Sequence, residues 1–460
     1  MGASTIAPIE VLAALQYATK YAPFTVKQKL SSGDIVHTLT SLGYLSAVAL
    51  MAVFVVVNYF GIRWFARINN VLVWWKLFII VLVIVAFFFA SFHGANFTDH
   101  GFKPQGWHGV FSAVATSGIV FSYLGFRQGI ELAGETDNPK RNVPIAVIGS
   151  VLITGVIYIA LQIAFIGALN PSLLKGGDAW ANLDFANSFG PLAAVASLLG
   201  LGWLAVLLYF DAIVSPGDTG MIYTTVTSRL SYAMARNGNA PQRLASTTER
   251  GVPLFSLIVT FVVGLIVFLP FPSWQQLVGF ITSATVLSFA SGPLVLSALR
   301  KQVPERERPF RLPGGHVLPL FAFWASNLIV YWSGWLTGWK LYIAVLLGFV
   351  LLAVFKVFGG VRQGKFHFRQ GFSWLFPWLG GLALVSYLGS FPDKSAGAGN
   401  LGVLNFGWSA LILAALSVLV YVIALNVCLS PEDVNEHIEQ FRREAQVEEE
   451  ELGDELGSAP

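Results

Sequence analysis

The chain has 460 residues, of which 55% are hydrophobic and only 12% are charged. Soluble domains usually carry about 25% charged residues, so the composition indicates an integral membrane protein, with the lipid bilayer and no nucleic acid as a partner. The single cysteine, Cys428, excludes an intrachain disulfide framework, and no Cys or His cluster suggests a metal or any other cofactor. The formal charge of +3 conceals an acidic tail, because residues 432–455 hold 11 of the 25 Asp and Glu residues.

Apolar runs of about 20 residues recur along the chain, and each predicts a transmembrane helix. The first run has no basic segment or cleavage site typical of a signal peptide, so it is interpreted as a span. The sixth run is too long for one span, and we expect it to continue into a cytoplasmic segment after Pro216–Gly217. The twelve predicted spans are residues 5–22, 40–60, 71–92, 109–134, 143–169, 188–223, 254–272, 275–299, 317–336, 338–357, 373–391 and 406–428.

Basic residues are distributed unevenly between alternate loops. One set of loops, together with the C-terminal tail, holds 19 Lys and Arg residues, whereas the other set holds six. Because cytoplasmic loops are enriched in Lys and Arg, the first set is predicted to be cytoplasmic, and so is the C-terminus. The six basic residues on the predicted outer side are Lys20, Lys27, Lys29, Lys103, Lys175 and Lys394.

Lys76 lies inside the third predicted span, in the run RINNVLVWWKLFIIVLVIV. One interpretation is that its long side chain lifts the ammonium to the membrane interface. The other is a buried lysine whose protonation is coupled to transport, because an ionisable group inside a span is costly and often functional.

The fourth predicted span, residues 109–134, is expected to be broken. It carries several glycines, and residues 122–126 interrupt its apolar pattern. Unwound backbone survives in a membrane only where it is buried in protein or lines a cavity, and its free N–H and C=O groups can bind the charged ends of a substrate. The alternative is a packed helix that tolerates glycine. The residues predicted to form the break are Ser122, Tyr123, Leu124, Gly125 and Phe126.

Three further polar side chains are candidates for the same site. Arg127 either pairs with Glu131 on one helix face or meets an anionic substrate side chain. Asp211 lies deep in the sixth run, with Ser215 nearby, and it either pairs structurally or takes part in transport. Thr282, in the eighth run, either lines the cavity or mediates helix packing.

Several motifs resemble the amino acid–polyamine–organocation permease superfamily. The run FSYLGFRQGIELAGETDNPKRNVPIAVIGSVLITGVIY combines a broken helix, a glutamate, Asn-Pro-Lys-Arg and a proline in the order found in that family. The runs SRLSYAMARNGNAP, followed by Val252-Pro253, and INNVLVWWKLFIIVLVIV agree with it. Together with PIEVLAALQYA, the resemblance covers about residues 6–300.

The resemblance implies an all-α membrane transporter built from two five-helix inverted repeats, each opening with a broken helix. The first two helices of that fold have no counterpart here, so an N-terminally incomplete fold is expected. The implied parts are residues 1–108 (three helices of the first repeat), 109–299 (the second repeat), 300–429 (four additional helices) and 430–460 (a cytoplasmic acidic tail).

The resemblance also implies roles for individual residues. Lys76 matches the lysine that, in proton-coupled members, stands where sodium sits in sodium-coupled relatives. Asp211 and Ser215 fall on the helix that faces this position, and Glu10 lies on the helix resembling the third of the family. These residues are therefore expected to serve proton coupling or to border the substrate site. The resemblance also implies that the unwound segment helps to bind substrate, with Phe121, Ser122, Tyr123, Leu124 and Gly125.

The expected function is proton-coupled symport of an amino acid by alternating access in a bacterial plasma membrane. Arg127 and a resemblance to the aspartate–proton symporter branch favour an acidic amino acid, such as aspartate or glutamate. A neutral amino acid or polyamine permease or exchanger, and a non-transporting fragment of such a permease, are the alternatives. A membrane enzyme would need a paired nucleophile and base, and a channel a repeated pore motif; the sequence shows neither.

Overall fold

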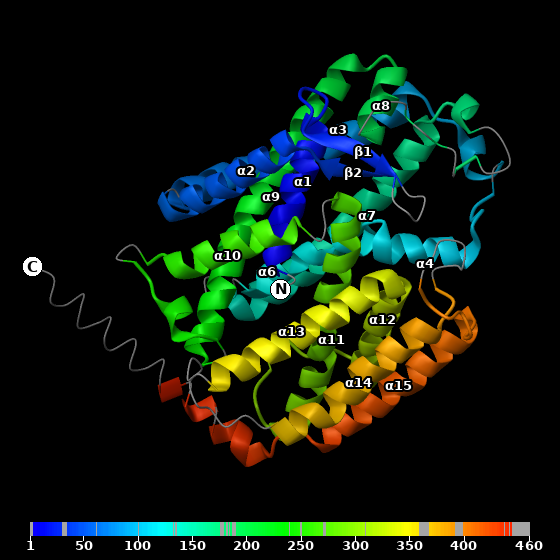
Figure 1. The fold of residues 1–460 in the computed structure, drawn as a ribbon. Coiled ribbons are helices and arrows are strands. Elements are labelled where there is room, and N and C mark those ends of the chain that lie inside the picture. Colours follow the sequence, from blue (N-terminus) through cyan, green and yellow to red (C-terminus); the bar gives the residue numbers. More distant parts are fainter. Residues whose placement is uncertain are drawn as a thin grey trace, which may run out of the picture. The chain divides into compact units, whose positions relative to one another are not determined.

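The fold was obtained as a computed structural model, and its helices are drawn in Figure 1. The chain forms two compact units. The first comprises Met1–Thr285, Trp332–Gly364 and Phe391–Gly399, and the second comprises Val286–Tyr331, Lys365–Ser390 and Asn400–Pro460. The structure describes residues 3–29, 35–60, 62–99, 101–131, 133, 136–174, 179–180, 183, 185, 190–238, 240–248, 251–269, 273–308, 310–357, 368–391, 399–436, 438–440 and 442–443.

The first unit is helical because its apolar runs satisfy their backbone hydrogen bonds within each helix, as a bilayer requires. Short 3-10 helices lie between the longer elements; in the described residues they are η1 (Ala3–Thr5), η2 (Gly94–Phe97), η3 (Leu124–Arg127), η5 (Pro171–Leu173) and η6 (Gln242–Ala245). The α-helices are α1 (Ile6–Ala18), α2 (Ser41–Phe60), α3 (Ile62–Ala90), α4 (Gly106–Thr116), α5 (Ile119–Ser122), α6 (Gln128–Glu131), α7 (Pro139–Ala168), α8 (Pro191–Leu198), α9 (Gly202–Arg236), α10 (Leu254–Val267), α13 (Trp335–Val357) and the first part of α11 (Trp274–Gln302).

The centre of the first unit is the packing of α1 along α9, which Figure 1 shows in dark blue and green. α9 also packs on α2, α3 and α10. Gly220 of α9 lets α2 pack closely against α9, because a Cβ atom at Gly220 would lie 2.5 Å from the ring of Phe54 in α2. Asn58 donates to the main-chain oxygens of Phe54 (2.8 Å) and Met221 (3.3 Å), which joins the two helices. α9 is therefore held on several sides.

The sixth predicted span is a short helix, α8, followed by the 35-residue helix α9. α9 runs without interruption through Pro216 to Arg236. The run thus continues past Pro216–Gly217 as expected, and it does so as one helix; the cytoplasmic location of the part after Pro216–Gly217 stays a prediction. Packing on the neighbouring helices supports α9 across the hydrogen bond that a proline cannot make. Asp218, just after the proline, is buried inside the unit.

A β-hairpin joins α1 to α2, and the sequence analysis did not predict it. β1 (Thr25–Lys29) pairs with β2 (Ile35–Leu39) in antiparallel register. Lys27 stands opposite His37, and burial together with the Lys27 charge lowers the pKa of His37. Thr40 Oγ1 donates to the main-chain oxygen of Pro23 at 2.7 Å, which fastens the hairpin base to the start of α2. The predicted helical class is confirmed in the described residues, and the hairpin is a short addition to it.

The second unit consists of α12 (Val317–Trp332), α14 (Phe368–Leu388), α15 (Phe406–Asn426) and the end of α11. α14 and α15 lie side by side, coloured orange in Figure 1. Buried Asn327 connects three helices, because its Nδ2 donates to Ser417 Oγ at 2.9 Å and its Oδ1 accepts from Trp378 Nε1 at 2.7 Å. This network specifies how α12, α14 and α15 pack.

Among the described residues, seven helices are long and apolar enough to cross a membrane, or eight if the bent pair Gly106–Thr116 and Ile119–Ile130 counts as one span. The apolar helices α1, α10 and α12 are shorter, at 10–17 residues. Every predicted span overlaps at least one helix, but the count of twelve spans stays a prediction. The seven are α2, residues 69–90 of α3, α7, residues 277–302 of α11, α13, α14 and α15.

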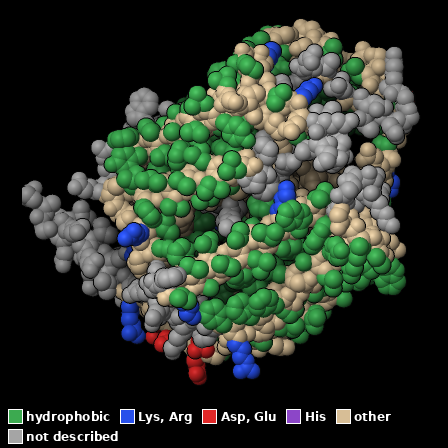
Figure 2. Space-filling model, viewed as in Figure 1, with side chains coloured by type: hydrophobic (Ala, Val, Ile, Leu, Met, Phe, Trp, Pro, Cys, Tyr) green, Lys and Arg blue, Asp and Glu red, His purple; other side chains and the backbone are tan. Residues whose placement is uncertain are grey.

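The outer surfaces of these helices are hydrophobic. Figure 2 shows hydrophobic side chains in broad patches on the face in view, with few Lys and Arg residues among them. Along α2, for example, Leu45, Val53, Val56 and Phe60 are at least half exposed. Patches of this extent are unusual on soluble monomers and are typical of surfaces that face lipid.

Candidate functional site

The segment that begins with α4 is broken, although the sharpest change of direction lies earlier in the sequence than predicted. α4 ends at Thr116, and Gly118 adopts a left-handed conformation with φ of 95°. The two halves of the segment, Gly106–Thr116 and Ile119–Ile130, are bent by 41°. The predicted interruption is therefore confirmed as a break in this span, but its main bend is at Ser117–Gly118 and the predicted residues form the short elements α5 and η3.

α7 supports the residues after the bend. Tyr158 OH donates to the main-chain oxygen of Ser122 at 3.2 Å, so this carbonyl is held by a side chain of the neighbouring helix. The rings of Tyr123 and Tyr158 meet edge to face with centroids 5.4 Å apart. The Tyr123 hydroxyl lies against α7 at Gly155, where a Cβ atom would be 3.3 Å away. The main-chain groups of the break are thus fixed on one side.

The other predicted residues of this segment point to different neighbours. Phe121 contacts Trp274, with ring centroids 6.5 Å apart, and Leu124 is buried. Arg127 is half-buried at the end of η3. The side chain of Glu131, which was the predicted partner of Arg127, lies outside the described residues, so this pair stays a prediction.

Lys76 forms a buried ion pair between α3 and α9. Its Nζ donates to Asp218 Oδ2 at 2.7 Å and lies 3.5 Å from Thr219 Oγ1. The side chains of Lys76 and Asp218 are 23% and 0% exposed. The second carboxylate oxygen of Asp218, Oδ1, is buried and has no hydrogen-bond partner in the described part of the chain. The Lys76 ammonium therefore pairs with a buried carboxylate instead of extending into solvent.

Asp211 and Ser215 lie beside this pair on α9. Asp211 Oδ1 accepts from Trp75 Nε1 at 3.0 Å, so it bonds to the neighbour of Lys76 and not to Lys76 itself. Lys76 still acts electrostatically on Asp211 and on Glu10 of α1. The Ser215 main-chain oxygen accepts from Thr219 Oγ1 at 3.2 Å. The lysine thus interacts electrostatically with one acidic side chain on α1 and two on α9.

Thr282 is fully buried in α11, and its hydroxyl has no hydrogen-bond partner among the described residues. The adjacent Ser283 has a packing role, since its hydroxyl donates to the Gly279 main-chain oxygen at 2.9 Å and to Ser333 Oγ at 2.7 Å. Thr282 is therefore available for another partner, although its proposed contact with substrate stays a prediction.

α3 connects the two groups of candidate residues, because it packs on α7, which supports the break, and on α9, which carries Asp218. The sequence analysis did not select Asp218 or Tyr158. A signal for Asp218 was present, since it follows Asp211 by seven residues and so lies on the same helical face. In the described part of the chain, no group of three His, Cys, Asp or Glu side chains could hold a metal ion.

Comparisons with known proteins agree with a transport role. The family model "Amino acid permease" matches residues 2–374. The chain is 37% identical over 426 residues to the glutamate/serine transporter AimA of Bacillus subtilis, covering 92% of this chain and 76% of that protein. It is 34% identical over 424 residues to the aspartate-proton symporter of the same organism, covering 91% and 78%. A branched-chain amino acid permease, BcaP, is 25% identical over 329 residues, covering 70% and 66%.

Proposed function

Because the chain belongs to the amino acid permease family, we propose that it is a secondary active transporter that couples amino acid uptake to protons. The main observation in favour of proton coupling is the buried ion pair between Lys76 and Asp218. Buried charges in a membrane protein are costly unless paired, and they often mark ion pathways. The pair therefore has a reason to be present beyond stability.

The pair can respond to protons through a change in its own charge. While Lys76 is protonated and Asp218 is ionised, the pair is neutral and its partners attract each other across α3 and α9. A proton bound by the Asp218 carboxylate gives the pair a net charge of +1 and removes that attraction. The open Oδ1 atom is a position where this proton would be held. Protonation would thus loosen α9 from α3, which is a movement that alternating access requires.

The substrate would bind at the broken segment. Main-chain groups near Tyr123 and Gly125 would meet its charged ends, and Arg127 and Thr282 would contact its side chain. An acidic amino acid is our first proposal, because Arg127 offers a positive charge and the names of two relatives include glutamate or aspartate. The branched-chain permease among the relatives supports a neutral amino acid as the second candidate.

We also propose the arrangement in the membrane. The repeats expected from the resemblance would comprise residues 1–108 and 109–299, followed by four further helices in residues 300–429 and a cytoplasmic tail in residues 430–460. The greater number of basic residues on one side supports a C-terminus in the cytoplasm of a bacterial cell, with the hairpin and the loop before α4 outside.

Uptake into proteoliposomes with an imposed pH gradient tests this function. The protein should accumulate labelled aspartate or glutamate above equilibrium, and dissipating the gradient with an ionophore should abolish accumulation. Lys76→Gln and Asp218→Asn should each remove accumulation while the protein remains in the membrane. Lys27→Gln, a change of an exposed lysine in the hairpin, is the matched control and should retain it.

Two results would contradict the proposal. Gradient-driven accumulation at the wild-type level in Lys76→Gln would exclude this lysine from proton coupling. Accumulation of leucine or a polyamine, with no uptake of either acidic amino acid, would replace the proposed substrate.

A further inference from the structure

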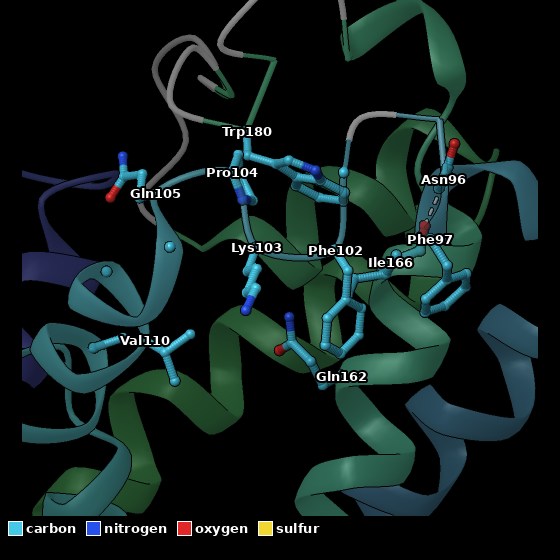
Figure 3. Close-up of a pocket in the computed structure, with 14 residues that line it drawn as sticks. Asn96, Phe97, Phe102, Lys103, Pro104, Gln105, Val110, Gln162, Ile166 and Trp180 are labelled. Carbon is cyan, nitrogen blue, oxygen red and sulfur yellow. Dashed lines mark hydrogen bonds between the residues drawn. The ribbon is translucent and has the colours of Figure 1, made fainter.

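A cavity of about 500 Å³ lies where α4 begins and α7 ends, within the first unit (Figure 3). Its walls come from η2 and the loop that precedes α4, from the first turns of α4, from the end of α7 and from Trp180. Small-molecule sites usually enclose roughly 300–1,000 Å³, so the cavity is large enough for a metabolite. It opens on the side that we propose to face outside the cell.

One wall of the cavity is firmly anchored. Asn96 is buried, and its Nδ2 donates to the main-chain oxygens of Ile166 (2.8 Å) and Leu169 (2.9 Å) at the C-terminal end of α7. His93 N donates to the Gly167 main-chain oxygen at 2.7 Å. The cavity is therefore formed by a loop that is hydrogen-bonded to α7.

The lining combines one cation, one amide and aromatic rings, and the side chains of Lys103, Gln162 and Phe102 are exposed. In Figure 3 the Lys103 ammonium and the Gln162 amide point into the same space, with Phe102 and Trp180 beside them. Lys103 Nζ also lies 4.3 Å from the centroid of the Trp107 ring, which favours this position of the cation. Among the described residues, no carboxylate forms an ion pair with Lys103. Its charge is thus available to a ligand.

We propose that this cavity is an outer binding site for a small carboxylate, namely an acidic amino acid. Lys103 would bind a carboxylate by a charge-assisted hydrogen bond, Gln162 would donate a second, and the aromatic rings would cover the carbon chain. The first turns of α4 form one wall, and α4 leads directly to the bend at Gly118. The site would hold substrate at the entrance of the broken segment; in this respect it rests on the proposed function.

A fluorophore at the cavity rim tests the proposal without relying on transport. Cys428→Ser removes the only cysteine, and Ala95→Cys, at an exposed position next to the cavity wall at Asn96, then accepts an environment-sensitive label in the purified full-length protein. Titration with L-aspartate should give a saturable change of fluorescence. A hydrogen bond between charged groups is strong, so Lys103→Gln should raise the aspartate concentration at half-saturation at least about tenfold. Lys103→Arg should retain binding, and Lys27→Gln is the control outside the cavity.

Three outcomes would overturn the proposal. One is a titration curve unchanged by Lys103→Gln, because the signal would then come from another site. The second is no saturable response to aspartate in the labelled protein. The third is a response to vesicles of phosphatidylglycerol and not to aspartate, which would make the cavity a lipid headgroup site.

The same measurement separates this inference from the proposed function. Aspartate binding that depends on Lys103, without uptake into proteoliposomes, would support the outer site and contradict the transport of aspartate. Gradient-driven aspartate uptake without any fluorescence response would support the function and contradict the outer site.

Discussion

The two carboxylate oxygens of Asp218 lie in different surroundings. Oδ2 accepts the Lys76 ammonium at 2.7 Å, whereas Oδ1 is buried with no hydrogen-bond partner in the described part of the chain. An incompletely satisfied buried carboxylate costs stability, and a hydrophobic pair of similar volume would often be at least as stable. This cost supports the proposal that the pair serves a step of transport.

The unequal burial of the two partners predicts unequal effects of replacing them. Lys76→Gln leaves the fully buried Asp218 charge uncompensated and should lower the free energy of unfolding by about 3 kcal/mol. Asp218→Asn leaves a lysine that is 23% exposed and should cost less. The double variant should recover part of the loss, because no unpaired charge remains. Denaturant titration in mixed micelles would measure all three, and strictly additive losses would contradict direct coupling of the pair.

The broken segment shows which part of an element can be predicted from sequence. Its glycines and the polar interruption predicted a break within residues 109–134, and a break is present. The position of the bend was not predictable, because Gly118, Gly125 and Gly129 can all adopt positive φ and only Gly118 among them does so. The choice depends on packing between α4, α5 and α7, which no local pattern encodes.

A substitution at Gly118 tests the importance of the bend. An added Cβ atom has room there, since the nearest atom is in the Trp274 ring at 3.9 Å, so the cost of Gly118→Ala is conformational. A left-handed φ costs an alanine about 1–2 kcal/mol, which should straighten the bend and reduce the initial rate of uptake severalfold.

Gly129→Ala is the matched control for this change. Gly129 lies in the same segment, its φ is not positive, and an added Cβ atom would make ordinary contacts of 3.6 Å with Val147 and 3.7 Å with Ala146. Uptake by this variant should stay near the wild-type rate. Equal uptake by both variants would show that the left-handed residue is dispensable.

α9 illustrates a second limit of sequence reasoning. Asp211 was selected because it lies deep in an apolar run, and the run was expected to continue into a cytoplasmic segment after Pro216–Gly217, where Asp218 follows. The helix continues through Pro216 because its contacts with α1, α2 and α10 compensate for one missing hydrogen bond. Tertiary packing therefore decided which of the two aspartates meets Lys76.

At the scale of the whole molecule, hydropathy and charge predict different things. Hydropathy located a helix in every predicted span, since long apolar runs leave the backbone few alternatives in a bilayer. It missed the hairpin, whose five-residue strands are too short for a clear alternating pattern. Charge predicts the orientation, because the unequal distribution of Lys and Arg extends over many loops and does not depend on any single one.

This orientation can be tested with two cysteines on opposite sides of the predicted membrane. In the Cys428→Ser background, Gln28→Cys places a thiol on the exposed part of β1, and Glu432→Cys places one after α15, also exposed. A membrane-impermeant maleimide should label Gln28→Cys in intact cells and label Glu432→Cys only after permeabilisation, because the basic loops anchor the other side in the cytoplasm. The opposite pattern would place Lys103 inside the cell, where its cavity would receive substrate after transport and not before it.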